Sequence, residues 1–185
     1  MTLQPTLPDG FHLCDLSISD LPEVVAMRDR IMSELAQSAR AEYYVFEESE
    51  EEFRGYFVTG AHADSFARGI RASSGKLAAC GVGTFRASEL TAFREFIPEE
   101  FKGAVGCVEL IQVEAEFRGR GFQSVLFQDL ERIFRERGAK ALFGVVSPFN
   151  LASLKNFQKA GYLEQERFYL PKCGYQRIKM RKILQ

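Results

Sequence analysis

The sequence of 185 residues contains no tryptophan and only two histidines, and its four cysteines are scattered. No Cys-x-x-Cys pair occurs, so the sequence lacks the ligand spacing of a structural zinc site, and we predict no bound metal. The cysteines are expected to be reduced thiols, mostly buried. They are Cys14, Cys80, Cys107 and Cys173. A reducing, cytoplasmic setting is therefore the default expectation.

Long apolar runs and a surplus of charge are also absent. No stretch approaches the ~18 apolar residues of a membrane span, and the first residues lack the basic start and apolar run of a signal peptide. The 24 Lys and Arg residues balance 25 Asp and Glu residues, for a net charge of −1. Broad nucleic-acid binders usually carry a basic surplus. We therefore expect neither a membrane nor a nucleic acid as partner.

What the chain does contain is typical of one globular domain spanning residues 1–185. Hydrophobic residues make up 46% of the sequence, and a domain of this length buries enough surface to need no disulfide. No internal repeat or linker interrupts it. Its charge is uneven, because five acidic residues cluster in 47–52, whereas 172–182 holds five basic residues and no acidic one.

The first half of the chain predicts a strand at 11–16 and then a helix capped by Asp20 or Ser19. A second helix is predicted at 49–59, followed by a β-hairpin of strands 66–72 and 76–86 and a short helix at 89–96. The small residues in the second hairpin strand predict that something packs closely on it, such as another backbone. That apolar strand could also pair edge to edge with a second copy, so a homodimer is left open.

The second half has a sharper pattern. A buried strand at 107–113 leads through a turn rich in Gly and Arg into an amphipathic helix at 122–137 and a strand at 141–146. Such a unit predicts two parallel strands and a right-handed crossover. Asn150 is predicted to cap a helix that ends near Gly161, before strands at 162–168 and 176–182. In the last strand, basic and apolar residues alternate, as in a half-buried strand.

The turn Arg118-Gly-Arg-Gly121 lies where a strand leads into a helix. Glycine permits a tight turn there, and the helix N-terminus offers free N–H groups and a positive dipole end to an anion. The arginines add donors that suit phosphate oxygens. Taken alone, the turn fits a plain arginine-rich loop equally well. It matches neither the P-loop nor the Gly-x-Gly-x-x-Gly dinucleotide fingerprint.

The run from Val108 to Gln123 resembles the acyl-CoA-binding motif of the GNAT superfamily of N-acetyltransferases. Arg118 and Gly121 match that motif's Arg/Gln-x-x-Gly-x-Gly/Ala pattern. A second segment, from Asn150 to Tyr162, is similar to the family's Asn-x-x-small-apolar-x-x-Tyr-x-x-x-Gly-Phe segment. The two matches lie within residues 107–162, in the family's order and separation.

This resemblance implies a mixed α/β fold, with a splayed, mixed β-sheet of six to seven strands flanked by about four helices. Acetyl-CoA, as co-substrate, would lie between the strand ending at Val113 and strand 141–146. Backbone groups of 111–113 would meet the pantetheine arm, and those of 119–124 the pyrophosphate. The implied contacts are Ile111, Gln112, Val113, Arg118, Gly119, Arg120, Gly121, Phe122, Gln123, Ser124, Asn150 and Ser153. Elements within 11–105 would bind the acceptor.

Two residues depart from the family pattern. Gln123 stands where Gly or Ala is most frequent, and Phe157 stands where many members have a tyrosine that protonates the leaving thiolate. Tyr162, Tyr169 or Tyr175 could substitute for that acid, with a preference for Tyr175 because it lies near the last strand.

Acetylation of an amine at neutral pH needs a base, since the ammonium has a pKa of about 8 to 10. Glu109, four residues before Val113 on the strand that would run beside the thioester, is the predicted base. The alternative is a Glu109 that pairs with an arginine or faces solvent.

The predicted function is transfer of an acetyl group from acetyl-CoA to a primary amine of a small molecule or peptide. A catalytically impaired acyl-CoA sensor or partner-binding module is the alternative, because of Phe157. Binding of another phosphorylated ligand is a third. The acceptor is open: the acidic run 47–52 favours a polycation, whereas Arg40, Arg68 or Arg71 could bind a carboxylate.

Overall fold

The computed structural model describes residues 6–38, 40–43, 50–57, 64–85, 91–101, 103–171 and 174–184. Within them, seven strands form one sheet in the order β1-β2-β3-β4-β5-β7-β6. The strands are β1 (Phe11–Leu16), β2 (Ser65–Ala72), β3 (Leu77–Thr84), β4 (Val105–Val113), β5 (Ala141–Val146), β6 (Leu163–Leu170) and β7 (Tyr175–Ile183). β4 and β5 pair in parallel, and the other neighbours pair antiparallel. The expected mixed sheet is confirmed.

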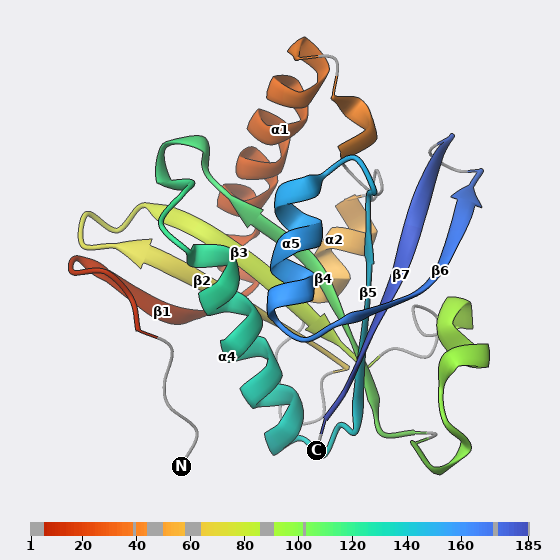
Figure 1. Ribbon diagram of the computed structural model, residues 1–185. Helices are drawn as coiled ribbons and strands as arrows, with labels where there is room; N and C mark the ends of the chain where they lie inside the picture. The colour runs from red at the N-terminus through yellow and green to blue at the C-terminus, as the bar shows by residue number, and fades with distance from the viewer. Residues whose placement is uncertain are drawn as a thin grey trace.

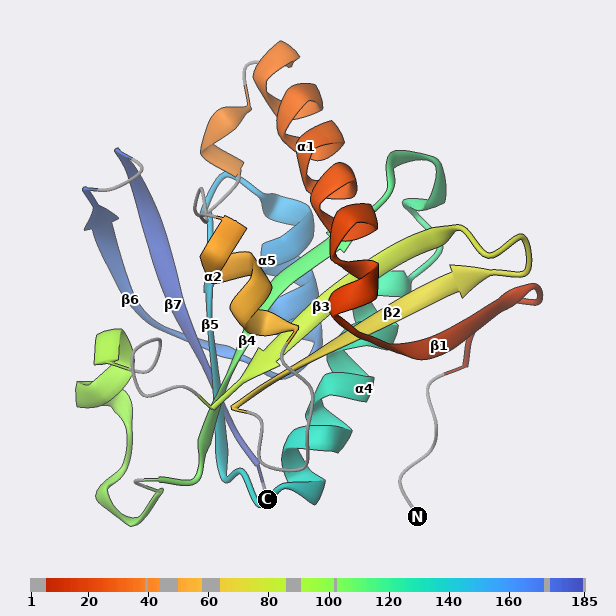
Figure 2. The same cartoon turned by 180° about the vertical axis from the view of Figure 1, so that it is seen from behind.

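Helices cover both faces of this sheet. They are α1 (Leu21–Gln37), α2 (Glu50–Tyr56), α4 (Phe122–Glu136) and α5 (Leu151–Lys159). α4 and α5 lie on one face (Figure 1), and α1 and α2 lie on the other (Figure 2). Short 3₁₀ turns join them: η1 (Ile18–Asp20), η2 (Ala41–Tyr43), η3 (Thr91–Phe96), η4 (Glu99–Phe101) and η5 (Ala115–Phe117). The sheet opens between β4 and β5, so that β5, β7 and β6 diverge from the first four strands (Figure 1).

Asp20 is the N-cap residue of α1, as predicted, but its side chain bonds to Ser17 before the helix and makes no capping hydrogen bond to α1. The backbone N–H of Ser17 donates to the Asp20 carboxylate over 2.8 Å, and the Ser17 hydroxyl donates to the same oxygen over 3.0 Å. Pro22 lies in the first turn of α1, where a missing N–H costs nothing. The helix buries Val24 and Met27 against the sheet.

The small residues of β3 predicted that another backbone packs closely on this strand. The structure instead places aromatic rings against Gly83. A Cβ built on Gly83 would lie 2.3 Å from the ring of Phe66 and 2.8 Å from that of Phe134, and one built on Gly106 of β4 would lie 2.1 Å from the Phe134 ring. Both positions therefore require glycine, because the Phe134 ring of α4 lies directly over them on the face of the sheet.

Two expectations about strand environments are wrong. β3 pairs with both β2 and β4, so it lies inside the sheet and cannot pair edge to edge with a second copy. The basic residues of β7 are not on a solvated face: Arg177 is fully buried and Lys179 is 8% exposed. Lys179 lies 5.0 Å from the ring of Phe96 in η3 and 2.7 Å from the Glu166 carboxylate. Arg181 also donates to the Phe96 carbonyl, so η3 lies against the basic residues of β7, which alternation along one strand cannot reveal.

Other expectations hold with shifted ends. α2 ends at Tyr56, whereas the helix was predicted at 49–59, and η3 is a 3₁₀ turn where an α-helix was predicted. The end predicted for α2, at 58 and 59, lies outside the described residues, as do the acidic residues 47 and 48 and Cys173. Cys14, Cys80 and Cys107 are free thiols. No helix in the described part of the chain is long and apolar enough to cross a membrane.

Candidate active site

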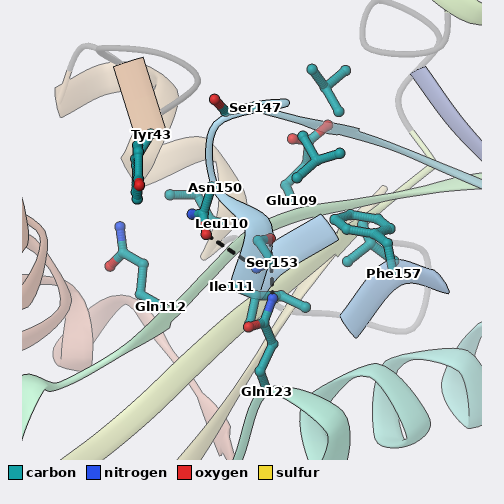
Figure 3. A pocket seen from close by; sticks show the side chains of 13 residues that line it. Tyr43, Glu109, Leu110, Ile111, Gln112, Gln123, Ser147, Asn150, Ser153 and Phe157 are labelled. Carbon is teal, nitrogen blue, oxygen red and sulfur yellow. Dashed lines mark hydrogen bonds between the residues drawn. The ribbon is translucent and has the colours of Figure 1, made fainter. Parts of the chain in front are cut away.

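A pocket opens where β4 and β5 separate. The two strands pair at three positions, from Val105 with Ala141 to Cys107 with Phe143, and their described pairing ends there. Figure 3 shows the side chains around the space beyond this point. The pocket is lined by Tyr43, Val108, Glu109, Leu110, Ile111, Gln112, Gln123, Val145, Val146, Ser147, Asn150, Ser153 and Phe157. The gap predicted between these strands is therefore a cavity with both apolar and polar walls.

A bulge in β4 forms one wall of this pocket. Leu110 has a φ of 49°, a left-handed conformation that is rare for a residue with a branched side chain. The register between β3 and β4 shifts at the same point, between Cys80 and Val82. A β-bulge interrupts the regular ladder and re-aims the groups beside it. Here it does so on the stretch of β4 that borders the gap.

Glu109 lies in the pocket, immediately before the bulge. It is paired with Val82, so the two side chains point to the same face of the sheet. Val82 packs with residues of α1 and α2, which places Glu109 on the face that these helices cover. The side chain is half-buried and its carboxylate is among the polar groups of the pocket in Figure 3. The structure thus brings the predicted base into the cavity, while its role stays a prediction.

The glycines of the turn before α4 both adopt left-handed backbone conformations. Gly119 has a φ of 79° and Gly121 a φ of 80°. Gly121 is the N-cap of α4, and a glycine offers no side chain to accept from the first N–H groups. The first helical bond runs from Val125 N–H to the Gly121 carbonyl over 3.1 Å. The start of α4 is therefore built with backbone donors and without a capping side chain, as an anion site requires.

The two arginines of this turn have different surroundings. Arg118 forms two hydrogen bonds, of 2.6 and 2.9 Å, to the Glu34 carboxylate of α1, and donates to the Val113 carbonyl over 3.3 Å. These bonds hold the pKa of Glu34 below its usual range. Arg120 lies over the rings of Phe11 and Phe117, at 5.7 Å from each. The bonds of Arg118 thus join α1 to the end of β4. Arg120, between the two glycines, is held by aromatic rings and makes no ion pair that ties it to α1 among the described residues.

The other sequence-predicted contacts of this region do not line the pocket. Phe122 is 1% exposed and packs against Phe11, so it can reach a ligand through its backbone alone. Val113 pairs with Ala79 at the end of β4. Ser124 is half-buried in the first turn of α4. Of the twelve predicted acyl-CoA contacts, the pocket collects Ile111, Gln112, Gln123, Asn150 and Ser153.

The start of α5 faces the same pocket. The Asn150 side chain accepts from the Ser153 N–H over 3.1 Å, which confirms the predicted cap. Phe157, one turn further along α5, is 5% exposed and lies in the pocket wall. A Cβ on Gly144 would be 2.7 Å from its ring, so β5 needs a glycine there. Phe157 therefore occupies a closely packed position with no hydroxyl to donate.

None of the three tyrosines considered as a substitute acid lines the pocket. Tyr162 is 2% exposed behind Phe157, with ring centres 5.1 Å apart, and burial raises its pKa well above the usual range. Tyr169 is exposed on β6, and Tyr175 is exposed at the start of β7, beside Arg177. The structure does not bring Tyr175 to the cavity.

Tyr43 of η2 does line the pocket, and sequence reasoning missed it. It belongs to a turn after α1, and the aromatic character of that stretch was the available signal. Arg40 lies 5.6 Å from its ring. Of the arginines considered for a carboxylate, Arg68 is instead paired with Asp129 over 2.5 Å, and Arg71 with Asp20 over 2.7 Å. Arg40 is the one beside a pocket residue.

Among the described residues, no group of three or more His, Cys, Asp or Glu side chains could hold a metal ion. The polar groups that the pocket offers are a carboxylate, amides and hydroxyls, and the backbone donors of α4 lie at the start of that helix. The site thus combines the gap between β4 and β5, the Glu109 carboxylate within it, and the glycine-capped start of α4.

The sequence model of the acetyltransferase (GNAT) family matches residues 27–162. The chain belongs to this family. The match includes α1 from Met27 onward and both segments from which the resemblance was argued. A search of curated proteins found no match.

Solved structures show the same fold. A GCN5-related N-acetyltransferase from Kribbella flavida has a TM-score of 0.72 and 21% identity, over 96% of this chain and 99% of its own. The ribosomal-protein-S5-alanine acetyltransferase from Vibrio fischeri has a TM-score of 0.70 and 13% identity, over 96% and 95%. The ribosomal-protein-S18-alanine N-acetyltransferase from Escherichia coli has a TM-score of 0.65 and 18% identity, over 92% of each chain. This GNAT protein shares their architecture at low identity.

Proposed function

We propose that this GNAT protein is an acyltransferase that moves the acetyl group of acetyl-CoA directly to a primary amine of a small molecule or peptide. The observation that carries the proposal is the pocket between the separating ends of β4 and β5, with Glu109 in it. The same proposal includes one acyl-CoA-binding domain over residues 1–185, no metal and a cytoplasmic setting. The free thiols of the described part of the chain support that setting.

The residues around the gap fit an acyl-CoA as substrate. The bulged stretch of β4 is not paired with β5 there, so backbone groups of 111–113 can meet the amides of the pantetheine arm. The glycine-capped start of α4, with Arg120 beside it, suits a pyrophosphate. Asn150 and Ser153 form the polar wall on the α5 side. Arg118 contributes by holding the turn to α1 through Glu34.

In the proposed reaction, Glu109 accepts a proton from the ammonium group, directly or through water. The neutral amine nitrogen then forms a bond to the acetyl carbon, the carbon–sulfur bond breaks, and the nitrogen gives its second proton to water to leave the amide. The thioester supplies an activated acyl group whose thiol, with a pKa of about 8.5, is a tolerable leaving group without an acid. Holding both reactants in the gap provides the larger share of the rate enhancement. Phe157 gives no proton to the sulfur, which leaves with its charge or takes a proton from water.

An acyl-CoA-binding sensor without turnover is the second candidate, and Phe157 favours it. The side chain lies in the pocket wall, while Tyr162 is buried behind it and Tyr175 lies away from the cavity. A protein that kept the binding gap and lost the acid would look like this. Binding without turnover would then be its property.

Thiol release after mixing with acetyl-CoA and a broad panel of amines tests the proposal. Acceptor-dependent release that is lost in Glu109→Gln, with acetyl-CoA binding retained, is the expected result. If wild type and Glu109→Gln bind acetyl-CoA equally and neither turns over any amine, the sensor is the better description. If calorimetry shows tighter binding of nucleotides than of acetyl-CoA, both candidates are wrong.

A further inference from the structure

A line of polar side chains connects the starts of α4 and α5 along the pocket. The Gln123 amide nitrogen donates to the Ser153 hydroxyl over 3.2 Å, and the Gln123 amide oxygen accepts from Asn156 over 2.7 Å. Ser153 is in turn bonded through its N–H to the cap Asn150. Gln123 and Ser153 both line the cavity, and Figure 3 shows the Gln123 side chain extending from α4 to Ser153.

A second, aromatic contact joins the same two helices one turn further along each of them. Phe127 follows Gln123 by four residues and Phe157 follows Ser153 by four, so each pair shares one helix face. The Phe127 and Phe157 rings lie 4.8 Å apart in the core. The aromatic contact is buried and holds the helices together away from the gap, whereas the polar contact lies at the cavity.

We propose that Gln123 is a positioning residue for the acyl-CoA: its carboxamide, through Ser153 and Asn156, holds the start of α5 at a fixed distance from the start of α4. The inference rests on the proposed function. α5 carries the pocket face formed by Asn150, Ser153 and Phe157. An alanine at 123 could form neither hydrogen bond, whereas the buried contact of Phe127 with Phe157 would remain. The position that departs from the family motif thus has a role of its own in this chain.

The test measures acetyl-CoA binding by calorimetry together with thermal unfolding. Gln123→Met keeps the length of the side chain and removes both hydrogen bonds, so we expect acetyl-CoA to bind about tenfold more weakly. The exposed Gln128 lies on the same helix, and Gln128→Met serves as the matched control with unchanged binding. If Gln123→Met lowers the unfolding temperature and leaves the affinity within twofold of wild type, the positioning role is wrong.

An exchange of side-chain lengths gives an independent check. Gln123→Asn shortens the reach from α4 by one methylene, and Asn156→Gln lengthens the reach from α5 by one. Each single variant should weaken binding severalfold. The double variant restores the hydrogen bond between residues 123 and 156 but not the one to Ser153, so it should bind more tightly than Gln123→Asn without regaining the full affinity. A double variant that binds no better than Gln123→Asn overturns the inference. Wild-type protein that fails to bind acetyl-CoA overturns the proposed function itself, which keeps the two failures distinct.

Discussion

Replacing Gly144 with alanine should destabilise the protein and disturb the pocket at the same time. An alanine Cβ there would lie 2.7 and 2.9 Å from two ring carbons of Phe157 and 3.3 Å from the Val108 carbonyl oxygen. Favourable contacts between non-bonded carbons lie at about 3.5 to 4.0 Å. The ring has little room to retreat, because the rings of Phe127 and Tyr162 lie 4.8 and 5.1 Å away. The added methyl group therefore forces the ring toward the cavity.

The expected cost follows from overpacking of a core, which is typically about 1–3 kcal/mol. We expect about 2 kcal/mol for Gly144→Ala, which in a chain of this size lowers the unfolding temperature by about 4–8 °C. Phe157→Leu removes the clashing ring atoms and should cost about 1–2 kcal/mol by itself. In the double variant the clash is absent, so its loss should equal that of Phe157→Leu alone, and the coupling free energy should equal the cost of Gly144→Ala, about 2 kcal/mol.

Urea unfolding of wild type, the two single variants and the double variant measures the coupling free energy. Titration with acetyl-CoA measures whether the pocket's affinity changes. Gly81→Ala is the graded control, because its Cβ would meet Ile111 and Leu130 at a milder 3.3 Å and should cost less. The reasoning is refuted if Gly144→Ala unfolds at the wild-type midpoint. It is equally refuted if the losses of Gly144→Ala and Phe157→Leu simply add, because the ring would then not lie over that glycine.

Three further changes have defined outcomes. Glu109→Gln should lower kcat by about 10²–10³-fold with acetyl-CoA binding unchanged, and a fall of less than threefold in steady-state assays contradicts its role as base. Gly121→Ala introduces a side chain at a φ of 80°, so it should lower the free energy of unfolding by about 1–2 kcal/mol and weaken acetyl-CoA binding. Gly75→Ala, at a φ of 87° in the hairpin, is its control: it should lower the free energy of urea unfolding by the same amount and leave binding unchanged. Burial, with a smaller contribution from the charge of Glu114, raises the pKa of the Cys80 thiol from 9.0 to about 12. Between pH 9 and 12 the thiol is therefore protonated in the folded protein and ionised in the unfolded one, so the free energy of unfolding should fall as the pH rises through this range. Cys80→Ala should flatten that fall in urea unfolding against pH, and an unchanged slope would contradict it.

The region that carries the family motifs was the most predictable part of the chain. β5 was predicted at its observed bounds, and Asn150 caps α5 as expected. These features depend on local signals: an apolar run between turn residues, and a polar side chain before a helix. The parallel pairing of β4 and β5 followed from the helix between them, because a crossover of that length returns the chain in the same direction.

The errors share another cause, which is contact between elements distant in sequence. The alternation in β7 predicted one apolar face, and it was right about Ile178 and Met180. It could not show that η3, some eighty residues earlier, lies against Lys179 and Arg181 on the other face. Tyr43 was missed for the same reason, because its place in the pocket depends on the position at which α1 ends. Local patterns predict which residues share a face and do not predict what lies over it.

The order of strands in the sheet differs from their order in the chain, and this constrains how the site is assembled during synthesis. β5 supplies Val145 and Val146 to the pocket, and it shares six register pairs with β7 against three with β4. β6 is made before β7 but pairs at the edge, beyond it. β5 therefore gains most of its pairing only after residues 175–183 have left the ribosome. Substitutions that delay or weaken the pairing of β7 with β5 should therefore yield chains in which β1 to β4 are folded but β5 does not yet form its wall of the gap.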